Sequence, residues 1–144
     1  MPPGLRLEHA PPLRGVRVLV AEDTPYVRQA LTDILECAGA AVTAVGSAEA
    51  ALAALKAERP DVLLSDLSMP GRSGYWLIDQ VRALPREHGG ATPAAALSGN
   101  PGPEHRASAL NAGFQYHLEK PLGIRDLVGI IAVLALNEEA RWAT

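Results

Sequence analysis

Short, uninterrupted apolar runs recur along the chain, and each is followed by a segment in which apolar residues repeat every three or four positions. A bounded run of about four to eight apolar residues is typical of a buried strand, and the longer repeat is typical of a helix. The pattern predicts strands at residues 16–20, 41–45, 61–65, 93–97 and 114–118. It predicts helices at residues 25–38, 48–59, 76–84, 103–111 and 124–136.

The expected strands are continuous apolar runs and do not alternate between apolar and polar residues. Runs of this kind belong to parallel sheets that helices cover on both faces. Right-handed crossovers and short loops leave few ways to connect such units. The sequence therefore predicts an α/β fold: a doubly wound (βα)5 three-layer sandwich with a parallel five-stranded sheet.

Three segments are expected along the 144 residues. Residues 1–14 hold four prolines and a glycine and read as a flexible leader or linker. Residues 15–136 form the domain, and residues 137–144 form a short C-terminal tail. The lone cysteine, Cys37, excludes an internal disulfide, and its place on an apolar helical face predicts a small buried side chain.

Composition and charge exclude several classes of partner. The formal net charge is −3, and the basic residues are scattered along the chain, so we expect no binding to nucleic acid. No apolar stretch approaches the ~20 residues that span a bilayer, and the first residues do not form a signal peptide. We therefore expect a cytoplasmic domain that makes no contact with a membrane.

Polar residues follow four of the five expected strands at the point where each strand ends. They are Glu22 and Asp23, Asp66, Ser98 with Gly99 and Asn100, and Lys120. In open α/β sheets, ligands bind beyond the carboxyl ends of the strands. We therefore expect three carboxylates, one hydroxyl and one ammonium to meet at one edge of the sheet.

Three carboxylates in one place raise one another's pKa unless a cation compensates them. Oxygen ligands in this number suit Mg²⁺, with Mn²⁺ as an alternative. A carboxylate can also accept a phosphoryl group while a metal ion neutralises charge. Asp66 is the candidate nucleophile because it stands centrally among these residues, and Ser98 and Lys120 are candidates for binding the phosphoryl oxygens.

The segments VRVLVAEDTPYVRQAL, PDVLLSDLSMPGRSGYWLI, PAAALSGN and GFQYHLEKPL resemble the receiver domain of two-component response regulators. The similarity covers roughly residues 14–136, with the motifs in the family's order and spacing. The opening LRGVRVLVAED and the closing GFQYHLEKP are most similar to receivers of hybrid histidine kinases. The resemblance implies a flavodoxin-like sheet in the order 2-1-3-4-5.

The resemblance also implies a role for each residue. Asp66 would accept a phosphoryl group from a histidine kinase or a histidine phosphotransfer domain. Asp23 and Asp66 would ligate Mg²⁺ directly, Glu22 would act mostly through water, and Ser68 would offer its backbone carbonyl. Ser98 would be the switch hydroxyl, with Gly99 beside it leaving room for a phosphoryl oxygen, and Lys120 would pair with the phosphate. A homodimer through the fourth helix, fifth strand and fifth helix is a further partner hypothesis.

Three residues depart from the commonest family pattern. Ser98 replaces a threonine and keeps the hydroxyl, and Glu22 replaces an aspartate and reaches one methylene further. His117 occupies the switch position, three residues before Lys120, where many receivers carry a tyrosine or phenylalanine. Histidine buries less apolar area and titrates near neutrality, so the usual aromatic switch is in question.

Two alternatives stay open at this point. One is a receiver-like interaction module that works without phosphorylation. The other is a metal-dependent phosphatase, but an aspartyl nucleophile in such enzymes is usually followed two residues later by a second acid, and here that position is Ser68. Ser68 and Asn100 are instead expected to tune a slow loss of phosphate. We therefore expect a switch and not an enzyme with multiple turnover.

Overall fold

The five apolar runs form one parallel sheet in the order β2-β1-β3-β4-β5, as expected. The computed structural model describes residues 11–99, 103–120 and 123–136. Its strands are β1 (Arg17–Ala21), β2 (Ala41–Val45), β3 (Val62–Asp66), β4 (Ala94–Ser98) and β5 (Tyr116–Glu119). Its helices are α2 (Pro25–Cys37), α3 (Ala48–Glu58), α4 (Gly74–Ala83), α5 (Pro103–Ala112), α6 (Ile124–Leu136) and the short 3-10 helix η1 (Arg86–His88).

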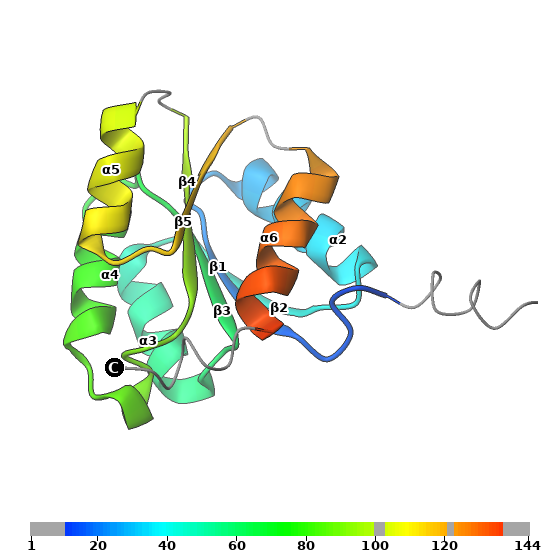
Figure 1. Cartoon of the computed structure of the whole chain (residues 1–144), viewed down its shortest axis with the longest axis horizontal. Coiled ribbons are helices and arrows are strands. Elements are labelled where there is room, and N and C mark those ends of the chain that lie inside the picture. The colour runs from blue at the N-terminus through cyan, green and yellow to red at the C-terminus, as the bar shows by residue number, and fades with distance from the viewer. Residues whose placement is uncertain (1–10, 100–102, 121–122, 137–144) are drawn as a thin grey trace, which may run out of the picture.

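The helices cover both faces of the sheet and make three layers. Helices α3, α4 and α5 lie on one face, and α2 and α6 lie on the other (Figure 1). Successive strand residues point to opposite faces, so Leu19 of β1 packs toward α3 and α4 while Val18 and Val20 pack toward α2 and α6. Both faces are buried, which explains why the strands read as continuous apolar runs.

Most strands begin one residue later than the pattern predicts. Strands β3 and β4 also end one residue later, so that Asp66 and Ser98 are their last residues and take part in the strand pairing. Strand β5 begins at Tyr116, two residues after its expected start, because Phe114 is buried in the turn that precedes it. The short helix η1 is not predicted by the apolar pattern.

Local capping fixes where several helices begin. Pro25 opens α2, since its missing N–H needs no partner in a first turn. The hydroxyls of Ser47 and Ser73 accept hydrogen bonds from the backbone N–H groups of Ala50 and Trp76, and so cap α3 and α4. Ser73 matters for the site because it fixes the helix that follows Asp66.

The packed core extends slightly before the expected domain boundary at residue 15. Leu13 is completely buried, and its N–H donates to the carbonyl of Ala38 at 2.8 Å. The first ten residues of the expected leader and the whole expected tail, residues 137–144, lie outside the described residues.

The expectation of a buried Cys37 is wrong, because Cys37 is exposed. Leu31 and Leu35 define the buried side of α2, and Cys37 lies about 200° around the helix from Leu35. Among the described residues, none of the helices has both the length and the apolar character needed to cross a bilayer.

Candidate functional site

The expected polar residues meet at the carboxyl edge of the sheet. Asp66 ends β3 and stands next to Leu97 in the β3–β4 ladder, while Glu22 and Asp23 directly follow β1, the other neighbour of β3. The backbone N–H of Lys120 donates to the carbonyl of Ser98 at 2.9 Å. The hydrogen-bond register thus places residues that are far apart in sequence along one line.

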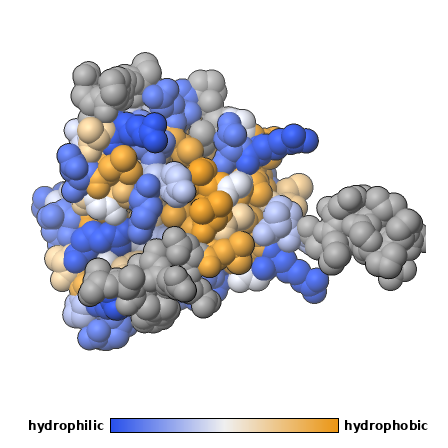
Figure 2. All heavy atoms as spheres, in the orientation of Figure 1, coloured by the Kyte–Doolittle hydropathy of each residue, from blue (hydrophilic) through white to orange (hydrophobic). Residues whose placement is uncertain are grey.

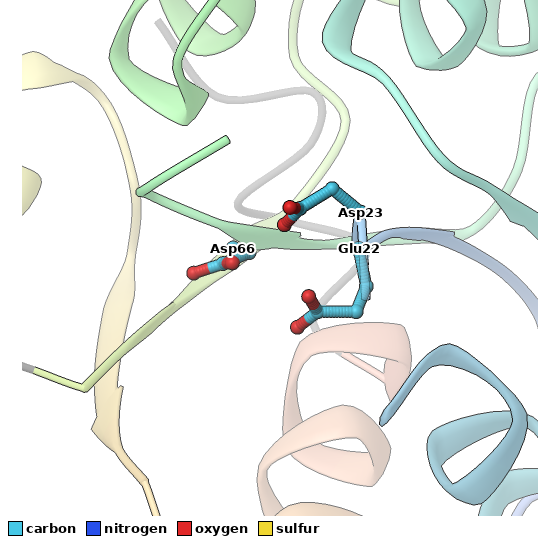
Figure 3. A group of neighbouring side chains, drawn as sticks. All are labelled: Glu22, Asp23 and Asp66. Atoms are coloured by element: carbon cyan, nitrogen blue, oxygen red, sulfur yellow. The ribbon is translucent and has the colours of Figure 1, made fainter. Parts of the chain in front are cut away.

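Three carboxylates form the centre of the site. One oxygen from each of Glu22, Asp23 and Asp66 lies within 4.8 Å of the others. Glu22 is completely buried, Asp66 is 5% exposed and Asp23 is half-buried. Figure 3 shows Glu22 and Asp23 leaving the end of β1 on opposite sides and bending toward Asp66, as expected for consecutive residues of an extended segment.

Lys120 supplies the positive charge at this edge. Its Nζ lies 2.8 Å from Oε1 of Glu22 and 3.6 Å from Oδ2 of Asp66. The ammonium therefore binds both acids and is closer to Glu22. The longer side chain of glutamate allows this contact, which the sequence alone did not predict.

Backbone amides also bind the acids. The N–H of Thr24 donates to Oε2 of Glu22 at 3.2 Å, and the N–H of Ser68 donates to Oδ1 of Asp66 at 3.3 Å. Both amides belong to turns that follow a strand. Each acid is therefore oriented by the turn that carries it, before any ligand is considered.

The surroundings shift the protonation equilibria of Asp66 and Lys120. Burial and the charge of Glu22 raise the pKa of Asp66, although the nearby Lys120 opposes this effect. Burial lowers the pKa of Lys120, but its hydrogen bond to Glu22 and the charge of Asp66 outweigh this effect and raise its pKa overall. A buried acid with a raised pKa at a cleft is typical of a functional site.

The acid cluster fits a divalent cation. Within the described residues, the ion pairs of Lys120 reach Glu22 and Asp66 but not Asp23, so one ammonium faces three carboxylates. Hard oxygen ligands at this spacing suit Mg²⁺. Glu22, Asp23 and Asp66 are the residues that would hold the ion.

The other expected site residues differ in how closely the structure describes them. Ser98 is buried at the end of β4 beside Lys120. Gly99 is exposed, and a Cβ there would meet nothing within 4 Å, so the space beside Ser98 is open. Ser68 is exposed. Asn100 lies outside the described residues.

His117 lies half-buried on the edge strand β5. Its Nε2 is buried and has no hydrogen-bond partner within the described part of the chain. Burial lowers the pKa of His117, the charge of Glu119 raises it, and those of Arg106 and His105 lower it. The local environment of His117 therefore favours the neutral form of its ring.

Two residues that support the site were not singled out from the sequence. A Cβ on Gly74 would lie 2.4 Å from the carbonyl oxygen of Asp66, so only glycine fits where α4 begins. Arg28 of α2 donates through Nη1 to the carbonyl of Glu22 at 2.9 Å. A glycine in the first turn of a helix is a detectable signal because glycine disfavours helix, whereas Arg28 offers no such signal.

Comparisons with known proteins found a matching family model and related sequences. The family model described as "Response regulator receiver domain" matches residues 18–132. The chain is 40% identical over 119 residues to an uncharacterized 14.6 kDa protein in the sodA1 3′ region of Leptolyngbya boryana, covering 83% of this chain and 89% of that protein.

A second relative is much longer than this chain. The sensory/regulatory protein RpfC of Xanthomonas campestris pv. campestris is 34% identical over 131 residues, which are 91% of this chain and 18% of RpfC. The similarity therefore concerns one part of RpfC.

A solved structure resembles the whole described fold. It is the receiver domain of sensor histidine kinase PA1611 from Pseudomonas aeruginosa PAO1, with a magnesium ion coordinated in its active site cleft. The TM-score is 0.77 at 29% identity, and the match covers 84% of this chain and 98% of that one.

Proposed function

The chain belongs to the response regulator receiver domain family, and from this membership we propose that Asp66 accepts a phosphoryl group and thereby switches the binding of a partner. The observation that carries the proposal is the position of Asp66 at the end of β3, between the Glu22–Asp23 pair and Lys120. Receivers are signalling switches and not ordinary enzymes, and we propose the same for this chain.

The proposed step forms one bond and breaks another. An oxygen of Asp66 attacks the phosphorus of a phosphohistidine, and the O–P bond forms as the P–N bond breaks. The departing imidazole nitrogen keeps the electron pair and takes up a proton. Glu22, Asp23, Asp66 and the backbone carbonyl of Ser68 would hold Mg²⁺, with Mn²⁺ as a substitute, and the ion would supply positive charge for the phosphoryl oxygens.

Residues of this chain would then respond to the new charge. Phosphorylation adds about −1.5 to −2 charges at Asp66. The Lys120 Nζ, now 3.6 Å from Asp66, would pair with a phosphoryl oxygen, and the Ser98 hydroxyl would donate to another. Lys120 would leave Glu22, so the movement would reach β5 and His117. A coupling of ~1–3 kcal/mol is typical of such switches.

The donor is a histidine kinase or a histidine phosphotransfer domain. This proposal rests on the similarity to the receiver of sensor histidine kinase PA1611. The chain spans only 18% of the length of RpfC. We therefore do not propose the activity of that longer protein for this chain. A cytoplasmic location stays a prediction.

The acceptor residue can be tested by intact mass. The full chain is incubated with phosphoramidate and Mg²⁺, and wild type should gain one phosphoryl group that hydroxylamine removes. Asp66→Asn should gain none, and Asp79→Asn, which changes an exposed acid on α4, should behave as wild type. No adduct on wild type, or an equal adduct on Asp66→Asn, would favour a module that works without phosphorylation.

The phosphorylated state should decay slowly on its own. Ser68 is exposed and carries no carboxylate that could act as a general base, and Asn100 is the second residue expected to tune the decay. The mass adduct should therefore persist after removal of the donor and decay at a rate that changes in Ser68 and Asn100 variants. Rapid turnover of an external phosphoester would instead indicate a hydrolase.

We propose that the surface formed by α5, β5 and α6 is a homodimer interface whose affinity responds to phosphorylation. Exposed apolar residues lie on each of these elements: Leu110, Tyr116 and Val133. Figure 2 shows the apolar surface concentrated over α6. Sedimentation velocity of the phosphorylated and unphosphorylated chain should reveal a larger dimer fraction after phosphorylation, and identical profiles would exclude this output.

A further inference from the structure

The guanidinium of Arg28 binds the backbone of the acid pair. Arg28 lies in the first turns of α2, and its side chain runs back toward the beginning of that helix. Its Nη1 donates to the carbonyl of Glu22 at 2.9 Å and to the carbonyl of Asp23 at 3.5 Å. We propose that Arg28 is a positioning residue that holds the turn after β1 so that the Glu22 and Asp23 carboxylates face Asp66.

The location of this cation needs an explanation. The beginning of a helix carries partial positive charge, so a cation there is disfavoured by the dipole of α2. Here two carbonyl acceptors and the neighbouring acids offset that repulsion. Sequences tend to break local rules of this kind at functional sites, and the residues that benefit are the two acids.

The glycine before α3 leaves room for the guanidinium. A Cβ on Gly46 would lie 2.9 Å from Nη1 of Arg28. Next to Gly46, the carbonyl of Val45 accepts a hydrogen bond from the N–H of Glu22 at 3.0 Å. The peptide groups on both sides of Glu22 are therefore fixed, one by Val45 and the other by Arg28.

Arg28 acts through the backbone, because its described contacts are with the carbonyls of the two acids and not with their carboxylates. Losing the guanidinium would free the turn and let the acids separate, while Asp66 and its Ser68 hydrogen bond stay in place. Loss of a residue that orients metal ligands typically lowers metal affinity about 10–100-fold. We therefore expect weaker Mg²⁺ binding with an unchanged nucleophile.

The test compares Mg²⁺ binding across four variants of the full chain. Arg28→Met keeps the apolar stem and removes the guanidinium, and Arg28→Lys keeps the charge but not the planar fork. Gly46→Ala displaces the guanidinium without changing Arg28. Arg17→Met is the matched control, because the Arg17 guanidinium also donates to carbonyls, those of Glu58 and Arg59 near the opposite edge of the sheet.

Isothermal titration of the unphosphorylated protein with Mg²⁺ gives the first result. Arg28→Met should raise the Mg²⁺ dissociation constant about tenfold, Arg28→Lys and Gly46→Ala should raise it by less, and Arg17→Met should leave it unchanged. In phosphoramidate assays, Arg28→Met should reach nearly the wild-type rate at saturating Mg²⁺ and lose rate only at low Mg²⁺.

Three outcomes would overturn the proposal. The first is an unchanged Mg²⁺ constant in both Arg28→Met and Gly46→Ala. The second is a lower maximal rate with an unchanged Mg²⁺ constant, which would place Arg28 at the reacting atoms. The third is equal weakening by Arg17→Met, which would indicate a loss of global stability. The inference rests on the proposed function, but a wild type that binds Mg²⁺ without taking up phosphate would defeat only that function.

Discussion

At the scale of single residues, the reactivity that we propose for Asp66 comes at the expense of stability. Its carboxylate is buried beside Glu22, and burial raises its pKa above the ordinary value of 3.8. The folded chain therefore binds this proton more tightly than the unfolded chain does. Stability therefore falls as the pH rises from 3.8 through the folded-state pKa.

Asp66→Asn should therefore stabilise the fold at pH 7 while it abolishes phosphate uptake. The amide keeps an acceptor for the Ser68 N–H and removes the repulsion from Glu22. Scanning calorimetry without Mg²⁺ should show a melting temperature a few degrees higher than wild type. Asp79→Asn should change it little, because that acid is exposed. A lower melting temperature for Asp66→Asn would contradict the assigned cost of the carboxylate.

Gly74 shows that the backbone around Asp66 is closely packed. A Cβ at this position would meet the Asp66 carbonyl at 2.4 Å and the Leu67 Cα at 2.9 Å. Both are backbone atoms, so the start of α4 would have to shift away from β3. Glycine is normally unfavourable in a helix, and here close packing against the site accounts for it.

Gly74→Ala should destabilise the fold by about 1–3 kcal/mol, the usual cost of overpacking, and should slow phosphate uptake because the peptide of Asp66 moves. Gly129→Ala is the matched control, since a Cβ there would meet nothing within 4 Å and the position lies inside α6. The control should gain about 0.5–1 kcal/mol. Urea unfolding measures the free energy of unfolding of both variants. An unchanged value for Gly74→Ala would show that α4 can shift without cost.

At the scale of elements, the apolar pattern was sufficient for the type of the five strands and five α-helices and for their order along the chain, although it missed the short helix η1. Strands buried on both faces and helices buried on one leave distinct signatures, as Val18 to Val20 in β1 and Leu31 with Leu35 in α2 illustrate. The parallel order then brings Asp66 and Lys120 to one edge. The meeting of the candidate site residues at this edge was therefore predictable from where the strands end.

Contacts to backbone carbonyls were not predictable in the same way. Arg82 of α4 donates to the carbonyls of Gly90, Thr92 and Gly113, and burial lowers its pKa to about 10. Nothing near Arg82 in the sequence marks these partners, because they exist only once the chain has folded. The contacts of Arg28 were not predictable from the sequence for the same reason.

Strand β5 carries His117, whose buried Nε2 has no hydrogen-bond partner among the residues that the structure describes. Burial lowers the pKa of His117 below its ordinary value of 6.5, so the unfolded chain takes up this proton first as the pH falls. Well above pH 6.5, His117 is neutral in both states and its protonation does not affect stability. Stability is lost as the pH falls from 6.5 toward the folded-state pKa.

His117→Phe should remove this part of the pH dependence. It also removes the buried Nε2, which no described residue pairs with, so the variant should be at least as stable as wild type at pH 7.5. The difference in urea midpoint between the two proteins should widen at pH 5.5. A constant difference across this range would show that His117 is equally solvated in both states. His88→Phe, which changes an exposed histidine, is the control.

At the scale of the whole molecule, the core and the site oppose each other. Two apolar clusters, one on each face of the sheet, stabilise the fold, while three acids at one edge repel each other with Lys120 as their ion-pair partner in the described residues. A ligand that binds these acids only in the folded state must stabilise the entire domain. Metal binding and folding are therefore linked.

Mg²⁺ should raise the free energy of unfolding with the logarithm of its free concentration once that concentration exceeds the dissociation constant. At a free concentration roughly ten times the dissociation constant, the expected gain is about 1.4 kcal/mol. Urea unfolding with and without Mg²⁺ measures it, with NaCl added to equal ionic strength because salt alone screens the acids. Asp23→Asn removes a carboxylate that no described ion pair compensates, so it should lose most of the gain and leave the core unchanged. An equal gain in wild type and Asp23→Asn would mean that the ion binds and stabilises the domain at another site. The repulsion among the three acids would then need another explanation.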